Sequence, residues 1–160
     1  MISNIFLSSV LFAAFILISP QGAAAQAGGS YKDMETEVLK YVNEHRTGMG
    51  LKPLRMNGII TAVAEKHTRN MAAGKIPFGH EGFNERMEQL SKQLKPTYSF
   101  AENVSEGAES AKEVVEQWLL SKEHKKNIEG KDYNLTGIGI QKGSDGKLYF
   151  TEIFIFKNYQ

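Results

Sequence analysis

Residues 100–124 read FAENVSEGAESAKEVVEQWLLSKEH and combine a clear helix with two side chains suited to chemistry. Ser110 and Glu113 have the spacing of a capping box, in which each side chain satisfies a backbone N–H of the first helical turn. The apolar residues that follow recur at helical spacing and predict one face packed on a core: Ala111, Val114, Val115, Trp118 and Leu119. Glu102 precedes this helix and His124 follows it, and neither belongs to its apolar face. We therefore expect both side chains to face a cleft.

The sequence on either side of this stretch predicts an α+β fold. Three upstream segments have apolar residues at helical spacing, and the predicted helices run from after Ser30 to Gly48, over 58–73 and over 83–93. Residues 125–133 are polar and predict a turn with a short helical start. Two apolar segments flank a Gly-Ser-Asp-Gly turn and predict a β-hairpin with strands at 135–142 and 147–157.

The last of these strands is apolar on both faces, which is typical of a strand that is covered on both sides. Because helices precede the hairpin, we predict a three-layer α/β/α sandwich in which helices cover both faces of a small antiparallel sheet. Trp118 is expected in the core between helix and sheet.

The first 25 residues have the pattern of a secretory signal peptide, with an apolar run at 5–18 and three alanines directly before Gln26. The apolar run is shorter than the roughly 20 residues that a transmembrane helix requires. We therefore expect cleavage before Gln26, a linker at 26–31 and one domain at 32–160. This mature chain is predicted to be secreted, to the extracellular or periplasmic space, without a transmembrane anchor.

Composition excludes several classes of function. The chain has no cysteine, so it carries neither a catalytic thiol nor a thiolate metal site, and its stability comes from packing rather than disulfides. Its formal net charge is +1, with lysines and glutamates interspersed along the chain. This pattern lacks the basic stripe that attracts nucleic acid or acidic lipid, and we expect no nucleic-acid partner.

A series of short motifs resembles the SCP domain of the CAP superfamily, which comprises cysteine-rich secretory, antigen-five and pathogenesis-related proteins. In chain order the motifs are Val42-Asn-Glu-His-Arg46, Gly50-Leu-Lys-Pro-Leu54, Ala64 with Met71, Phe78-Gly-His80, Ala101-Glu-Asn-Val104, Trp118, His124 with Asn127-Ile128, and Gly137-Ile-Gly139. The match extends from about Lys32 to Lys157. Since the chain has no cysteine and its loops are short, it is most similar to bacterial members.

The resemblance implies an α/β/α fold with a central cleft lined by two histidines and two glutamates, which binds a divalent metal in several members. The matching positions here are His80, Glu102 and His124. The position of the second glutamate is occupied by Ser121, so the resemblance implies a site of three residues rather than four.

Two imidazoles and one carboxylate are a typical ligand set for zinc with an open coordination position. Alternatively, His80, Glu102 and His124 form only a hydrogen-bonded polar cluster. A serine hydrolase would use Ser99, Ser105 or Ser121, although no Gly-x-Ser-x-Gly nucleophile motif is present. His45 and His67 lie on predicted helix faces, where a histidine more often donates to a backbone carbonyl, and we place both outside the site.

These observations predict a secreted, non-catalytic SCP module that binds a small or lipid-like ligand, or an extracellular protein, in or beside the cleft. The alternative is a metal-dependent extracellular hydrolase that uses the same cleft and a divalent metal such as zinc. A third interpretation is a scaffold that binds no small ligand.

Overall fold

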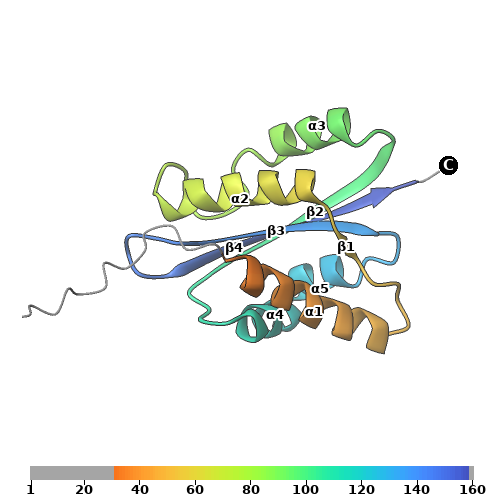
Figure 1. Cartoon of the computed structure of the whole chain (residues 1–160), viewed down its shortest axis with the longest axis horizontal. Helices are drawn as coiled ribbons and strands as arrows, with labels where there is room; N and C mark the ends of the chain where they lie inside the picture. The colour runs from red at the N-terminus through yellow and green to blue at the C-terminus, as the bar shows by residue number, and fades with distance from the viewer. Residues whose placement is uncertain (1–30, 159–160) are drawn as a thin grey trace, which may run out of the picture.

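The computed structural model describes residues 31–158, which form five helices and four strands (Figure 1). In chain order these are α1 (Lys32–Gly48), β1 (Arg55–Met56), α2 (Gly58–Ala72), α3 (Phe83–Gln93), β2 (Thr97–Glu106), α4 (Ala111–Leu120), α5 (Lys122–Ile128), β3 (Leu135–Lys142) and β4 (Leu148–Lys157). The predicted signal peptide and the Ser30 cap lie outside the described residues. The helices predicted at 58–73 and 83–93 are confirmed, within one residue at their ends.

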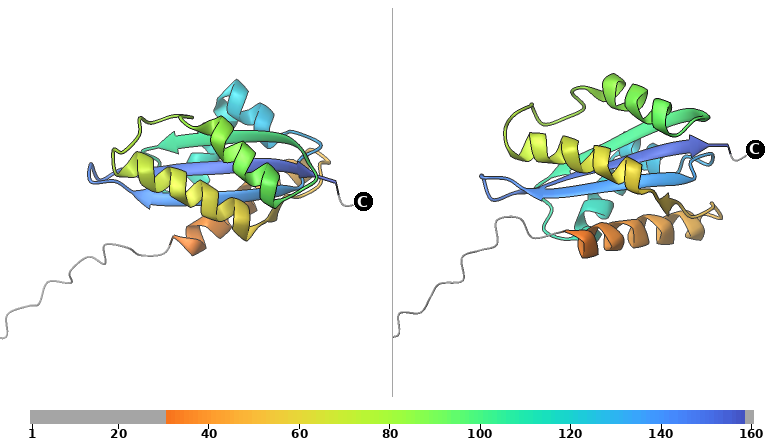
Figure 2. Two further views of the ribbon diagram at one scale, coloured as in Figure 1. Left: turned by 90° about the horizontal axis from the view of Figure 1, so that it is seen from above. Right: turned by 45° about the horizontal axis from the view of Figure 1, so that its top comes forward.

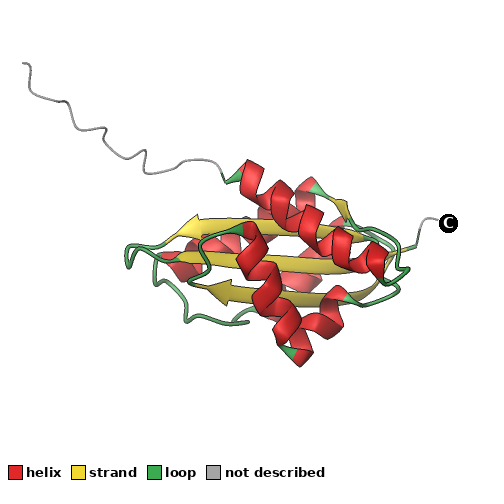
Figure 3. Cartoon of the chain, turned by 90° about the horizontal axis from the view of Figure 1, so that it is seen from below, coloured by secondary structure: helices red, strands yellow, loops and turns green. Residues whose placement is uncertain are grey.

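The strands form one sheet in the order β1-β3-β4-β2. The predicted hairpin is confirmed as β3 and β4, and β4 is antiparallel to both of its neighbours. Helices α2 and α3 cover one face of the sheet (Figure 2), and α1, α4 and α5 cover the other (Figure 3). The predicted α/β/α sandwich is therefore confirmed, with one difference: the two-residue β1 pairs parallel to β3.

Strand β2 and helix α5 differ from the prediction. No strand was predicted at 97–106, because this segment lacks a regular alternation of polar and apolar residues. Its adjacent residues Glu102 and Asn103 are both buried, one on each face of the sheet, so polar groups interrupt both faces. The helical start expected at Lys125 is a complete helix that begins at Lys122, with Ser121 as its N-cap.

The core has two parts, one on each side of the sheet. Trp118, Phe150 and Phe154 lie in the part that faces α1 and α4, while Ile60, Leu90 and Ile153 lie in the part that faces α2 and α3. Trp118 is 1% exposed, as predicted, and its Nε1 donates to the carbonyl of Val104 at 3.3 Å. Because β2 is the outer strand, this bond satisfies a backbone group on the free edge of the sheet.

Helix α2 lies directly on β3, and two glycines make this contact possible. A Cβ atom at Gly137 would lie 2.2 Å from the backbone N of Thr61, and one at Gly139 would lie 2.4 Å from the backbone N of Glu65. The close approach requires glycine at both positions, which accounts for the Gly137-Ile-Gly139 motif.

Arg46 anchors the segment that follows α5. Its guanidinium is fully buried and donates to four backbone carbonyls, those of Lys52, Ile128, Gly130 and Tyr133. A buried arginine is stable only when its donors are satisfied, and here the acceptors fix the path of the chain between α5 and β3.

Candidate functional site

The structure brings His80 and His124 to one cleft on the outer edge of β2. His80 lies in the loop between α2 and α3, and His124 lies on α5. The cleft has a volume of about 520 Å³, and the other residues that line it are Phe78, Gly79, Val104, Ser105, Glu106, Gln117, Trp118 and Ser121. Ser121, which occupies the position of the second glutamate in the family resemblance, also lines the cleft.

Glu102 lies behind His80 rather than in the open cleft. Its side chain is 1% exposed, whereas that of His80 is 50% exposed. Arg86 of α3 holds the carboxylate with two bonds, from Nε to Oε2 at 2.9 Å and from Nη2 to Oε1 at 2.7 Å. His80 Nδ1 lies 2.9 Å from Oε1, so both carboxylate oxygens are engaged by protein donors.

This network keeps Glu102 ionised. Burial by itself opposes the negative charge, but the hydrogen bonds from His80 and Arg86 and the charge of Arg86 together lower the pKa of Glu102 below its ordinary value. A bidentate pair with arginine has the geometry that best compensates a buried carboxylate. Glu102 is therefore a fixed anion that orients the His80 ring.

His67 contacts the backbone of the same loop. It is buried on α2, and its Nε2 donates to the carbonyl of Gly79 at 2.9 Å, next to His80. Burial lowers the pKa of His67. The charge of Glu102 opposes this shift, whereas the charges of Arg86 and His80 add to it. The prediction that His67 donates to a backbone carbonyl is confirmed.

His45 is also structural, but its partner is a side chain. His45 lies on α1 and does not line the cleft, and its Nε2 lies 2.8 Å from Glu129 Oε1. The prediction that placed His45 outside the site therefore agrees with its position, while the expected carbonyl acceptor is replaced by a carboxylate.

Two asparagines hold His124 against β2. Asn103 Nδ2 donates to the carbonyl of His124 at 3.1 Å, and Asn127 Nδ2 donates to Asn103 Oδ1 at 2.9 Å. Burial, followed by the neighbouring charge of His80, lowers the pKa of His124. The imidazole is therefore neutral near neutral pH and can accept a hydrogen bond or a metal.

The three predicted site residues are close together, but they do not fit a three-ligand metal site as arranged. Within residues 31–158, no group of three or more His, Cys, Asp or Glu side chains has the arrangement of a metal-binding cluster. The reason lies in Glu102, whose two oxygens are both occupied. The donors that remain for a metal are His80 Nε2 and the His124 imidazole, with Glu102 behind His80 in the position of an orienting carboxylate.

The serines of the hydrolase alternative have other partners. Ser105 Oγ donates to Gln117 Oε1 at 2.9 Å, and Ser121 Oγ accepts from the backbone N of His124 at 3.5 Å. Ser99 lies away from the cleft, in a pocket formed with the segment that follows α5. Among residues 31–158, no hydrogen bond joins the hydroxyl of Ser99, Ser105 or Ser121 to an imidazole, the contact that activates a serine nucleophile.

Arg86 is a site residue that the motifs did not predict. It lies three residues after Phe83 and four before Leu90, so it belongs to the inward face of the predicted helix 83–93. An arginine on an inward helix face requires a buried acceptor, and a carboxylate is the usual one. That signal was present in the sequence, and Glu102 is the partner that it required.

The comparisons with known proteins identify the family. A model of the cysteine-rich secretory protein family, CAP, matches residues 39–154. The chain belongs to the CAP family. This CAP chain is 29% identical over 135 residues to the uncharacterized protein YkwD of Bacillus subtilis (strain 168), a match that covers 82% of the chain and 50% of YkwD. The chain thus spans half the length of that relative.

Solved structures share the CAP fold. An outer surface protein from Borrelia burgdorferi has a TM-score of 0.71 at 21% identity, covering 81% of this chain and 96% of that one. An extracellular protein containing an SCP domain from Bacillus anthracis str. Ames has a TM-score of 0.64 at 20% identity, covering 79% and 41% of the two chains. At these identities the likeness establishes the fold alone. In the described part of the CAP chain, no helix has the length and apolar character needed to cross a membrane.

Proposed function

We propose that this CAP chain is a secreted, non-catalytic binding module that holds a small or lipid-like ligand, or a segment of an extracellular protein, in the cleft between His80 and His124. The predicted signal peptide supports secretion, as do the extracellular and outer-surface names of two structural neighbours. Mass spectrometry of exported protein tests this part of the proposal. The expected chain begins at Gln26, and secreted protein with an intact Met1 contradicts it.

One observation favours binding over metal-dependent hydrolysis. Both oxygens of Glu102 accept hydrogen bonds from Arg86 and His80, so the carboxylate serves to position His80. Catalytic zinc sites hold the metal with three protein ligands and keep one open position. A cleft that offers two imidazoles falls one ligand short of that arrangement, while its aromatic and polar lining is suited to contact a ligand.

The alternative, a metal-dependent extracellular hydrolase, rests on the neutral His124 imidazole and the outward Nε2 of His80. A divalent metal held there would supply an activated water molecule. Because Glu102 orients His80 through Nδ1, the ring is fixed for such a role, and this alternative requires a direct test.

Calorimetric titration of zinc into the wild type, His124→Ala and His45→Ala separates the two functions. His45→Ala is the matched control because it removes an imidazole outside the cleft. Metal held by His80 and His124 gives heat near neutral pH that disappears in His124→Ala, persists in His45→Ala and falls as the pH drops below about 6, where imidazoles become protonated. Absence of heat from the wild type excludes the metal and the hydrolase that depends on it.

A heat signal that follows this pattern calls for a second measurement, of zinc-dependent ester and peptide hydrolysis. We expect no hydrolysis above the rate of the zinc-free protein. Zinc-dependent turnover that is lost in His124→Ala would replace the binding module with the hydrolase.

A further inference from the structure

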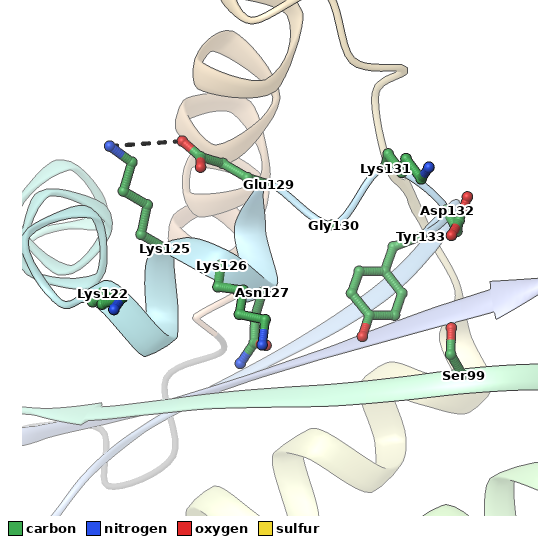
Figure 4. A pocket seen from close by; sticks show the side chains of 10 residues that line it. All are labelled: Ser99, Lys122, Lys125, Lys126, Asn127, Glu129, Gly130, Lys131, Asp132 and Tyr133. Atoms are coloured by element: carbon green, nitrogen blue, oxygen red, sulfur yellow. Dashed lines mark ion pairs between the residues drawn. The ribbon is translucent and has the colours of Figure 1, made fainter.

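A second pocket lies on the other side of α5, and it is larger than the cleft. It has a volume of about 730 Å³, and its lining residues come from β2, from α5 and from the segment that connects α5 to β3. We call it the lysine pocket because four lysines line it: Lys122, Lys125, Lys126 and Lys131 (Figure 4). No residue lines both the lysine pocket and the cleft. Its volume is in the usual range of small-molecule sites, roughly 300 to 1,000 Å³.

The lining has four lysines and two carboxylates, Glu129 and Asp132, and so carries a formal net charge of +2. Glu129 is already held by His45 at 2.8 Å and by Lys125 at 3.8 Å. Across residues 31–158, no carboxylate forms an ion pair with Lys122, Lys126 or Lys131. The lysine pocket therefore combines a concave shape with an excess of cations, although the net charge of the whole chain is only +1.

The arrangement of these lysines carries an electrostatic cost. Lys122, Lys125 and Lys126 are three and four residues apart on α5, which places like charges side by side on one helix. Such pairs destabilise a helix by a few tenths of a kcal/mol each, roughly 0.2 to 0.5. The ion pair of Lys125 with Glu129 and the position of Lys125 and Lys126 in the last turn of α5 offset part of this cost. An anion in the pocket would reduce the repulsion that remains.

The opposite wall supplies uncharged hydrogen-bonding groups in a fixed position. Lys126 and Asn127 form one wall, and Tyr133 with Ser99 forms the other (Figure 4). Burial, followed by the charge of Asp132, raises the pKa of Tyr133, so its hydroxyl remains protonated near neutral pH. Arg46 holds the carbonyls of Gly130 and Tyr133 at 2.9 and 3.1 Å, which fixes this wall before any ligand binds.

We propose that the lysine pocket binds a phosphate ester through the ammonium groups of its lining lysines, with the hydroxyls of Tyr133 and Ser99 on the wall opposite Lys126 (Figure 4). Lysines bind phosphate as point charges that approach from several directions, which suits a tetrahedral group. The lining contains no arginine, the residue that favours planar, bidentate recognition of carboxylates. The site is distinct from the cleft, and the proposal does not depend on the cleft's function.

The test compares a pocket variant with a charge-matched control. Lys126→Gln/Lys131→Gln removes two lining cations, and Lys52→Gln/Lys112→Gln removes two exposed cations that do not line the pocket. Binding of glycerol 3-phosphate is measured by calorimetry at low ionic strength, where screening is weak. In parallel, co-sedimentation measures binding to vesicles of phosphatidylglycerol mixed with phosphatidylcholine. Vesicles of phosphatidylcholine alone measure the binding that does not depend on an anionic headgroup.

We expect binding to at least one probe, weakened by roughly tenfold or more in the pocket variant and unchanged within about twofold in the control. Binding of glycerol 3-phosphate identifies a soluble ester as the ligand, and binding of phosphatidylglycerol vesicles alone identifies a lipid headgroup. Absence of binding to both probes overturns the proposal. An equal loss of binding in both double variants also overturns it, because the net charge of the protein would then explain the binding. Full binding by the pocket variant overturns it as well. His124→Ala should bind phosphate normally, which separates this result from any failure of the cleft.

Discussion

Arg86 gives the most direct test of the network that positions His80. The substitution Arg86→Met keeps much of the aliphatic length of the side chain and removes the charge and both bonds to Glu102. Because the Glu102 side chain is 1% exposed, the variant leaves a buried carboxylate with His80 as its remaining close donor. Removal of one partner from a buried ion pair costs about 3 to 5 kcal/mol, and we expect a loss of unfolding free energy in this range near neutral pH.

The cost should depend on pH with a defined sign. In the wild type the pKa of Glu102 is lowered, so its stabilising contribution is present above the ordinary value of about 4.5 and is lost as the pH falls through the lower, folded-state pKa. Without Arg86, its hydrogen bonds and its charge no longer oppose the effect of burial, so we expect the pKa of Glu102 to rise from its wild-type value. The variant can then protonate Glu102 in mildly acidic solution, so the difference from the wild type should shrink as the pH approaches about 4.5.

Urea unfolding followed by the fluorescence of Trp118, the single tryptophan, measures this difference at neutral and mildly acidic pH. Arg86→Met/Glu102→Gln is the control, because an amide carries no buried charge, and it should regain most of the lost stability. The reasoning fails if Arg86→Met costs less than about 1 kcal/mol near neutral pH, if its cost is independent of pH, or if the double variant is as unstable as the single one.

Three further predictions concern the core. Burial raises the pKa of Glu152 to about 8, so its carboxyl stays protonated in the folded state at pH values where the unfolded chain ionises it. The free energy of unfolding should therefore fall by about 1.4 kcal/mol per pH unit as the pH rises from about 4.5 to 8. Urea unfolding at several pH values should find this slope in the wild type and not in Glu152→Gln. Trp118→Ala should cost about 3 to 5 kcal/mol by circular dichroism, and an unchanged midpoint would mean that the side chain contributes no packing. Gly139→Ala should lower the stability measured by thermal unfolding by at least about 1 to 3 kcal/mol, because its Cβ would meet the backbone of α2. Gly48→Ala, with open space around it, should not destabilise the protein. Equal effects of the two substitutions would contradict the close packing of α2 on β3.

The sequence by itself determined the elements whose burial follows a regular period. Helices α2, α3 and α4 were predictable because an apolar face repeats every three to four residues, and the β3–β4 hairpin because two apolar strands flank a glycine-rich turn. The motifs likewise predicted that His80 and His124 share a cleft, and the CAP family and the α/β/α fold followed from the same residues.

Tertiary structure alone decided the features that depend on partners far apart in the chain. Strand β2 was missed because an outer strand beside a cleft buries polar groups on both faces, so its sequence lacks the alternation that marks a strand. The role of Glu102 depends on Arg86, sixteen residues earlier, because a buried carboxylate needs a cation as its partner and the packing of α3 on the sheet places Arg86 beside it. The lysine pocket exists because Arg46 fixes the chain after α5 opposite Ser99 of β2. Periodicity records which face of an element is buried, but it carries no information about which distant side chain lies against that face.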